Sequence, residues 1–410
     1  MNTFFSLLTI RRLSLGLILV ALVALAAASS GATQTAGGAV YLPFATGSMP
    51  RFELTPVGGG FNSVTDVTHA GDDRLFIAEQ AGVIKILHPD GRINTFLDIR
   101  HQVISHRGEY GFFSLAFHPD YNDPTADGYR LFYVAYTTGF DDGETLEVDF
   151  IVSRFRTSAD PNLADGATET ILLREKQSFD VHKGGGMAFD PRDHMLYVGM
   201  GDDRLLNVAQ SDRTPKGKII RLEVDRIPPN ATGDRSATTI DEIWAFGFRN
   251  PWRIDVDWVS DQIFVGEVGD ALWEEINIVP MKLQGVNYGW HCMEGPLVIP
   301  EANDHPECQN PETFQRAIHE YPHRDGNFRC AVIGGKVYRP DTNPGDNRFI
   351  FADMCTREIF SLTPTAGVWQ RDLLGVHDGH LISTIGEDRR GRQYIGTIDP
   401  SGPIYRLTIP

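Results

Sequence analysis

The chain has 410 residues, a formal net charge of −17 and a composition that is 41% hydrophobic and 22% charged. This apolar content is enough for a large buried core, so the composition excludes a disordered chain. The acidic balance excludes nucleic acids and anionic membrane surfaces as expected partners, because both are bound through clustered Lys and Arg. The 4 cysteines are too few for a fold built on disulfides, but they suit one or two disulfides on an ordinary core.

The first 30 residues have the pattern of a secretory signal peptide. Arg11 and Arg12 precede an uncharged run from Leu13 to Ala28, which ends in small residues. The alternative is a membrane anchor, although the run is short against the roughly 20 apolar residues that span a bilayer. We therefore predict cleavage of residues 1–30, a flexible leader over residues 31–50, no stable membrane insertion after cleavage, and a secreted or periplasmic location.

The remainder, residues 51–410, repeats one pattern. A turn containing Gly, Asp or Asn leads into an aromatic-rich strand, and a second short strand follows. Six such units favour a six-bladed β-propeller of four-stranded antiparallel sheets over a sandwich or barrel. The paired segments are 73–78 with 82–87, 129–136 with 151–155, 194–199 with 217–222, 261–266 with 275–279, 347–352 with 357–362, and 391–396 with 403–407.

A histidine followed by glycines is the first candidate for chemistry. His182 is separated by one residue from the Gly184–Gly186 triplet, and Gly201 and Asp202 end the next predicted strand. Glycines let the backbone approach a ligand closely, and histidine is the side chain best suited to act as a general base near neutral pH. The alternative is a histidine that only caps a turn, and the residues alone do not decide between the two.

Two further constellations follow along the chain. Arg249 and Asn250 lie between aromatic stretches, where an Arg fork and an amide could bind carboxylate or carbonyl oxygens. The acidic segment 267–277, followed by 285–290, offers the hard oxygen ligands that Ca²⁺ prefers. Its spacing is not that of an EF-hand, so spacing alone favours an acidic surface turn.

All the cysteines lie between residues 292 and 355. Of the three possible connectivities, Cys292 with Cys308 and Cys330 with Cys355 is the simplest. In an exported chain structural disulfides are far more common than redox sites. We expect them to close long loops of the fourth and fifth blades.

Five motifs occur in the order typical of one family, namely 108–119, 182–185, 247–251, 273–277 and 287–290. On these motifs the chain, from about residue 67 to 407, resembles the glucose/sorbosone dehydrogenase family. Its members include soluble aldose sugar dehydrogenases that use pyrroloquinoline quinone (PQQ) and Ca²⁺ on a six-bladed propeller. The cysteine-containing region is similar to the branch that includes hedgehog-interacting-protein-like proteins.

The resemblance implies roles for the residues near the predicted cofactor. His182 matches the general base that takes the proton of the anomeric hydroxyl, and Asp202 matches the acid that orients it. Arg249 and Asn250 match a pair that contacts the cofactor, with Arg249 stabilising negative charge on the reduced quinone oxygens. Glu109 stands where some members have a Gln beside the cofactor.

The resemblance also implies two calcium sites. The backbone carbonyls of Gly269 and Asp270 match those that hold the Ca²⁺ beneath PQQ, where the ion polarises the quinone. Glu275 and Tyr288 match a second, structural Ca²⁺ site.

The chain departs from the family pattern in places. Lys183 replaces an Asn, Asp270 replaces a Pro, and the stretch 380–386 lacks the Arg pair with which some members grip the carboxylates of PQQ. We expect Lys183, Arg249 and Ca²⁺ to balance that charge instead. The resemblance implies an exported quinoprotein that oxidises aldose sugars at C1 to lactones and passes electrons to an external acceptor. The alternative is a Ca²⁺-stabilised binding propeller that has lost PQQ and catalysis.

Overall fold

The structure is a computed structural model that describes residues 52–205, 207–236, 242–302, 305–339 and 347–409. The chain divides into residues 1–47 and a compact unit from Ser48 to Pro410. The predicted signal peptide and leader lie outside the described residues and stay predictions. In the described part of the chain, no helix is both long and apolar enough to cross a bilayer.

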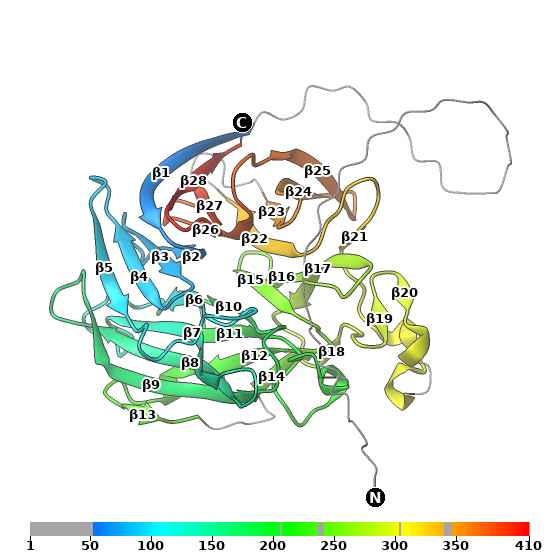
Figure 1. Cartoon of the computed structure of the whole chain (residues 1–410), viewed down its shortest axis with the longest axis horizontal. Helices are drawn as coiled ribbons and strands as arrows, with labels where there is room; N and C mark the ends of the chain where they lie inside the picture. Colours follow the sequence, from blue (N-terminus) through cyan, green and yellow to red (C-terminus); the bar gives the residue numbers. More distant parts are fainter. Residues whose placement is uncertain (1–51, 206, 237–241, 303–304, 340–346, 410) are drawn as a thin grey trace, which may run out of the picture. The chain divides into compact units, whose positions relative to one another are not determined.

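Six sheets form a ring around a central channel (Figure 1). In chain order the first three blades are β2 (Val64–Thr68), β3 (Leu75–Glu79), β4 (Val83–Leu87) and β5 (Ile93–Asp98); β6 (Phe112–Phe117), β7 (Leu131–Asp141), β8 (Leu146–Thr157) and β9 (Ala164–Gln177), with β13 (Gly233–Asp234); and β10 (Gly184–Phe189), β11 (Met195–Met200), β12 (Lys218–Glu223) and β14 (Ile243–Phe246), with β18 (Val286–Asn287).

The other three blades complete the ring. They are β15 (Pro251–Asp257), β16 (Gln262–Glu267), β17 (Trp273–Pro280) and β21 (His319–Pro322); β22 (Val332–Tyr338), β23 (Arg348–Asp353), β24 (Glu358–Thr365) and β25 (Val368–Val376); and β26 (Ile382–Glu387), β27 (Gln393–Thr397), β28 (Gly402–Thr408) and β1 (Glu53–Phe61). The first described strand, β1, pairs with the last, β28, so the two ends of the propeller close one blade.

The prediction of a six-bladed all-β propeller is confirmed, and the repeated segments are the second and third strands of each blade. Two blades depart from the predicted four antiparallel strands. Each gains a fifth, parallel strand: β13 pairs with β9, and β18 pairs with β14. Both added strands have two residues and come from loops far along the chain.

The core lies between neighbouring blades, so the middle strands are buried on both faces. Every residue of β3 is buried, for example. In the first interblade cluster Phe96 packs against Phe76 of its own blade and Phe132 of the next, with ring centroids 5.0 and 5.1 Å apart. Burial of a side chain of this size stabilises the fold by roughly 1.5–3 kcal/mol. This two-sided burial explains why the strands read as apolar runs.

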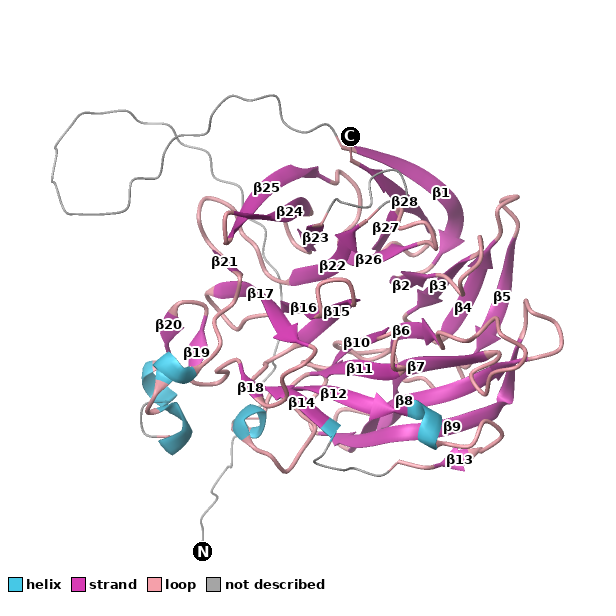
Figure 2. Ribbon diagram, turned by 180° about the vertical axis from the view of Figure 1, so that it is seen from behind, coloured by secondary structure: helices cyan, strands magenta, loops and turns pink. Residues whose placement is uncertain are grey.

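The disulfides pair Cys292 with Cys308 and Cys330 with Cys355, as the simplest connectivity predicts. The first closes an insertion of the fourth blade between β17 and β21, and the second joins the segments that flank β22 and β23 of the fifth. The insertion contains β19 (Met293–Glu294), β20 (Leu297–Val298) and the 3-10 helices η4 (Pro300–Ala302), η5 (Pro306–Cys308) and η6 (Pro311–Thr313). Figure 2 shows the insertion outside the ring of inner strands; the other described short helices are η1 (Val208–Gln210) and η2 (Val224–Arg226).

Candidate active site

The propeller topology brings the predicted site residues to one end of the channel. Loops that precede the inner strands β6, β10 and β15 carry Glu109, His182 and the pair Arg249 and Asn250. Asp202 and the segment after Glu267 follow the second strands β11 and β16. Because the second strand of a blade runs antiparallel to the first, its end lies beside the first strand's beginning. Residues spread over more than 160 positions therefore converge.

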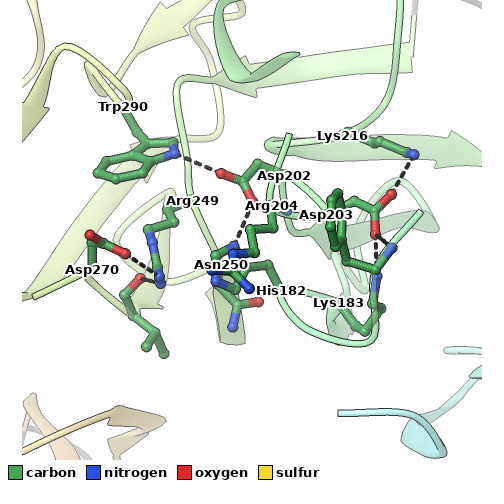
Figure 3. A network of polar contacts seen from close by, with 12 residues as sticks. His182, Lys183, Asp202, Asp203, Arg204, Lys216, Arg249, Asn250, Asp270 and Trp290 are labelled. Atoms are coloured by element: carbon green, nitrogen blue, oxygen red, sulfur yellow. Dashed lines mark hydrogen bonds and ion pairs between the residues drawn. The ribbon is translucent and has the colours of Figure 1, made fainter. Parts of the chain in front are cut away.

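His182 and Asp202 form a hydrogen-bonded dyad (Figure 3). The Nδ1 atom of His182 lies 2.7 Å from Oδ1 of Asp202, and both side chains are largely buried, with 11% and 4% of their surface exposed. A carboxylate only accepts hydrogen bonds, so Nδ1 carries the proton and the Nε2 atom of the neutral ring keeps a free lone pair. No described residue is a hydrogen-bond partner of that Nε2 atom.

The carboxylate of Asp202 is held from two further sides. The indole Nε1–H of Trp290 donates to Oδ2 over 2.7 Å, and the backbone N–H of Arg204 donates to Oδ1 over 2.7 Å. The backbone N–H of Asp202 also donates to the carbonyl of Arg249. Asp202 is therefore fixed before any substrate binds, and it fixes the tautomer and the orientation of His182. Sequence reasoning does not single out Trp290 for this role.

The turn after β11 leaves no room for a side chain at Gly201. A Cβ atom built there would lie 2.1 Å from the carbonyl oxygen of His182. The backbone N–H of Asp203 donates to that same oxygen over 3.3 Å. His182 itself adopts a left-handed backbone conformation with φ of 57°. The glycine in front of Asp202 is thus required for the close approach of the two loops that form the dyad.

Arg249 and Asn250 are held by the buried carboxylate of Glu267. Its Oε1 atom accepts the backbone N–H groups of Arg249 at 2.5 Å and of Asn250 at 2.9 Å. The Asn250 side chain accepts the N–H of Gly184 at 2.8 Å and faces Glu109, with Nδ2 3.4 Å from both carboxylate oxygens. Glu109 also accepts the N–H of Lys183. The pair thereby joins three blades at the channel mouth.

The positive charge of Arg249 is already balanced by a carboxylate. Its Nη2 atom lies 2.7 Å from Oδ1 of Asp270, its Nη1 donates to the carbonyl of Val268, and its guanidinium lies 5.5 Å from the ring centroid of Trp290 (Figure 3). Asp270 is half exposed, whereas the Arg249 side chain is nearly buried. The side chain of Asp270 therefore lies directly beside the guanidinium of Arg249.

Lys183 does not reach the channel mouth, so the expectation that its charge is available to a cofactor is wrong. Its ammonium is buried and contacts Oδ1 of Asp203 at 2.5 Å and the side chain of Gln177 at 2.6 Å. Lys216 contacts the other oxygen of Asp203 at 2.8 Å. These contacts make Lys183 part of a buried ion network next to the site and remove it from the cations that face a ligand.

Replacing Lys183 with Met is expected to lower the free energy of unfolding by about 3–5 kcal/mol, because it leaves part of a buried carboxylate charge unpaired. Urea unfolding at pH 7 measures the change. Lys176→Met, at an exposed position of β9, is the matched control and should change stability by no more than about 0.5 kcal/mol. A loss below 1 kcal/mol for Lys183→Met would contradict the buried placement of its ammonium.

A second feature of this end is a small acidic cavity of about 10 Å³, room for about one water-sized body. Its described lining comprises Gly247, Arg249, Glu267, Gly269, Glu275, Asn277, Tyr288, Trp290, Met293 and Glu294. Gly269, Glu275 and Tyr288, which the family resemblance assigns to two calcium sites, thus line one cavity. Asp270 is absent from the described lining.

Two residues that line this cavity have a buried oxygen atom without a hydrogen-bond partner, namely Oε2 of Glu267 and Oδ1 of Asn277. Burial raises the pKa of Glu267 well above its ordinary value, and the nearby Glu275 raises it further. Burial raises the pKa of Glu275 to about 7. The carboxylates of Glu267 and Glu275, together with the unpaired amide oxygen of Asn277, are the kind of oxygen ligands that a hard cation such as Ca²⁺ prefers. Glu267 and Asn277 stand in segments that the sequence picks out, but sequence reasoning assigns neither as a ligand.

The turn that includes Gly269 and Asp270 wraps around another carboxylate. The Oε1 atom of Glu294 accepts four successive backbone N–H groups, those of residues 270, 271, 272 and 273, over 2.7–3.1 Å. Tyr288 is held by stacking on Phe248 at 4.6 Å and by a hydrogen bond from its hydroxyl to the carbonyl of Ile278. Both predicted metal segments are therefore rigidly placed.

The channel mouth also contains an apolar cavity of about 180 Å³. Its described lining comprises Ser63, Val64, Thr65, Gln80, Gly108, Glu109, Phe112, Phe113, Asn250, Trp252, Val268, Ala331, Ile333, Met354, Ser383 and Ile398. Glu109 and Asn250 give it a polar wall, and Ser63, Thr65, Gln80 and Ser383 add further polar groups to a lining that is otherwise aromatic and aliphatic apart from Gly108. No Lys or Arg is among the described residues that line it.

Several known proteins are similar to this chain in sequence or in fold. The human Hedgehog-interacting protein is 32% identical over 402 residues, covering 88% of this chain and 53% of that protein. The crystal structure of the soluble aldose sugar dehydrogenase of Escherichia coli has a TM-score of 0.70 at 19% identity and covers 88% of this chain and 100% of that one. The PQQ-bound aldose sugar dehydrogenase of Streptomyces coelicolor has a TM-score of 0.66 at 17% identity, covering 88% and 99%.

At these identities the two solved structures show the six-bladed fold and nothing finer. The chain spans about half the length, or less, of the curated relatives that it matches first. Residues 61–406 match the family model described as glucose/sorbosone dehydrogenase, which covers nearly the whole propeller. The chain therefore belongs to the glucose/sorbosone dehydrogenase family.

Proposed function

We propose that the protein is an exported sugar dehydrogenase that oxidises an aldose at C1 to the lactone, with PQQ and Ca²⁺ as cofactors and an external electron acceptor. The single observation that carries the proposal is the dyad of His182 and Asp202 at the channel mouth. Export is supported by the two disulfides, which persist in oxidising compartments.

In the proposed reaction His182 removes the proton of the anomeric hydroxyl through its free Nε2 atom. The C1–H bond breaks as a hydride leaves, the C1–O bond gains double-bond character, and the ring imidazole becomes a cation. Asp202 stabilises that cation through Nδ1–H, and Trp290 keeps the carboxylate aligned. When bound, PQQ would accept the hydride and a neighbouring Ca²⁺ would polarise its quinone.

The donor set fits calcium. Glu267, Glu275 and Asn277 supply carboxylate and amide oxygens around a cavity large enough for one ion, and two of these atoms are buried without a partner. A divalent cation there would replace the protons that burial favours on these two carboxyl groups and would stabilise their charged forms.

The residues at the channel mouth supply apolar surface and hydrogen-bond donors for PQQ, but too little positive charge for its carboxylates. Phe112, Phe113 and Trp252 offer flat apolar surface in the cavity that Asn250 also lines. Arg249, the preceding residue, carries hydrogen-bond donors but is not among the described residues that line this cavity. Three carboxylates, however, need more positive charge than Arg249 supplies, because Asp270 already pairs with it and Lys183 is buried elsewhere. Bound Ca²⁺ is therefore a requirement of the proposed cofactor site.

That charge deficit favours a second candidate function, a Ca²⁺-stabilised binding propeller without PQQ. The described lining of the apolar cavity contains no Lys or Arg, and the stretch 380–386 has no Arg. The human relative is named for a protein that it interacts with. In this case the same mouth would hold a ligand without oxidising it.

Reconstitution separates the two functions. The purified protein is incubated with PQQ and Ca²⁺ and passed through gel filtration, and glucose or arabinose is then added with an artificial dye acceptor. The enzyme retains quinone absorbance and reduces the dye only when sugar is present. Protein that emerges without quinone and never reduces the dye, at any of several aldoses, would rule out the dehydrogenase and leave the binding propeller.

A further inference from the structure

Two histidines and a glutamate face one another in the insertion of the fourth blade. His291 precedes Cys292 at the start of the loop that the first disulfide closes, while His305 and Glu307 precede Cys308 at its end. Cys292, Met293, Ala302, Cys308 and Phe314 form a small apolar cluster of their own in this insertion. The proposed reaction uses neither histidine.

The three side chains lie at distances that suit a shared ion. The Nε2 atom of His291 is 4.0 Å and the Nδ1 atom of His305 is 3.5 Å from Oε1 of Glu307. One ligand atom from each of the three side chains lies within 4.8 Å of the others. These gaps exceed the roughly 2.7–3.2 Å of a hydrogen bond to nitrogen. They approach the separation of about 3.3–3.6 Å between two ligands that share a tetrahedral Zn²⁺ with bonds of about 2.0–2.2 Å.

A second histidine cluster provides the contrast. Oδ1 of Asp225 lies 3.0 Å from Nε2 of His118, and Oδ2 lies 2.9 Å from Nδ1 of His194, so both rings are hydrogen-bonded directly to this carboxylate. That cluster is satisfied without an ion. In the insertion, by contrast, no hydrogen bond shorter than 3.5 Å links the three facing groups. The Nε2 atom of His291, which faces Glu307, also lies 4.0 Å from Sγ of Cys308, and the other ring nitrogen, Nδ1, is buried without a partner.

We propose that His291, His305 and Glu307 bind a divalent transition-metal ion, with Zn²⁺ as the ion that suits them best. Two imidazoles and one carboxylate are a common set of three protein ligands, with water in the fourth position. His291 is buried with 8% of its side chain exposed, whereas His305 and Glu307 are 34% and 32% exposed, so the ion would enter from solvent.

The ion would close the same loop as the disulfide between Cys292 and Cys308. His291 also follows Trp290, whose indole holds the active-site carboxylate of Asp202. A metal at this position would therefore restrain the segment that carries Trp290, but its binding does not depend on the sugar chemistry proposed above. The two sites differ in donor type, since oxygen ligands suit calcium and imidazoles suit zinc.

The test is zinc binding by the intact, oxidised protein in excess Ca²⁺, which keeps hard-cation sites filled. After removal of transition metals with a chelator, Zn²⁺ is titrated and its stoichiometry is measured by calorimetry and by elemental analysis after gel filtration. We expect one Zn²⁺ per chain and a higher melting temperature with Zn²⁺. His305→Ala and Glu307→Gln should each weaken binding by at least about 100-fold, since loss of an outer partner alone costs about 10–100-fold.

The matched control is His101→Ala, which removes an exposed histidine outside the insertion and should bind Zn²⁺ like the unaltered chain. Without Zn²⁺, all three variants should melt at the same temperature as the unaltered protein, because the replaced side chains are at least partly exposed. The proposal is overturned if the unaltered protein takes up no zinc, or if His305→Ala and Glu307→Gln bind it as tightly as His101→Ala does.

Discussion

Replacing His182 with Ala is expected to lower kcat for aldose oxidation by about 10²–10⁴-fold, while quinone is retained after gel filtration. The reason is that Nε2 of His182 is the proposed proton acceptor, whereas the contacts of Arg249, Asn250 and Glu267 do not involve its ring. Steady-state dye reduction by the reconstituted protein measures the effect, and a melting curve checks that the fold is unchanged.

Trp290→Phe is the graded control for His182→Ala. It removes the indole N–H that donates to Asp202 but keeps an aromatic ring over Arg249. The decrease in kcat should be smaller than for His182→Ala, on the order of tenfold or less. Losing a whole hydrogen bond to a charged group costs about 1.5–3 kcal/mol, but Asp202 keeps its other donors, so only part of that energy is lost. Unchanged kcat in His182→Ala would refute its role as the base.

Replacing Glu267 with Ala is expected to lower the free energy of unfolding by about 2–6 kcal/mol, because the buried N–H groups of Arg249 and Asn250 each lose their acceptor. Glu267→Gln is the matched variant, since its amide oxygen can still accept both N–H groups. It should fold well but lose the rise in melting temperature that Ca²⁺ gives the unaltered protein. A full calcium shift in Glu267→Gln would exclude Glu267 as a ligand.

The same cavity predicts a pH dependence of stability in the absence of calcium. The folded-state pKa of Glu275 is raised to about 7, and that of Glu267 is raised well above its ordinary value, both through burial. A carboxyl whose pKa is higher in the folded than in the unfolded state contributes stability that is full at low pH and is lost as the pH rises through the folded pKa. The contribution of Glu275 therefore declines between about pH 4.5 and 7, and that of Glu267 declines as the pH rises above the ordinary range of a glutamate.

Calcium should reverse this decline, because an ion replaces the protons that the two carboxyl groups otherwise keep. Urea unfolding across pH 5–8, with and without Ca²⁺, measures both slopes. Glu267→Gln should show a weaker decline without calcium and no rescue with it. A calcium-free protein in which Glu267→Gln leaves the pH slope unchanged would contradict the account of this cavity.

Much of the fold could be predicted because each blade repeats its second and third strands as apolar runs. The inner strands were harder to predict. The residues of β10 read as Gly-Gly-Gly-Met-Ala-Phe, a composition typical of a loop, yet they pair with β11 and line the channel. The parallel strands β13 and β18 could not be predicted, because two residues carry no periodicity and their partners are set by tertiary contact alone.

The candidate site also contains contacts that could be predicted from the sequence and placements that could not. The family resemblance implies that Asp202 orients His182, and the structure places Nδ1 of His182 2.7 Å from Oδ1 of Asp202. Lys183 follows His182 directly, but the sequence does not say on which side of the backbone its ammonium lies, and the structure buries it. Glu267 could have been found from the sequence, because it directly follows one predicted strand and Glu275 begins the next. The structure pairs the two residues directly across β16 and β17, and opposed carboxylates are unfavourable unless something compensates their charge.

The most direct test of the proposed chemistry is a single turnover. The protein loaded with PQQ and Ca²⁺ is mixed without oxygen or dye with an excess of aldose, and the quinone absorbance is followed in the unaltered protein and in His182→Ala. We predict rapid loss of the quinone band with one equivalent of lactone in the unaltered protein, and a rate at least about 100-fold lower in His182→Ala. Equal rates in the two proteins, or a quinone band that no aldose changes, would contradict the assignment of this channel mouth as the site of sugar oxidation.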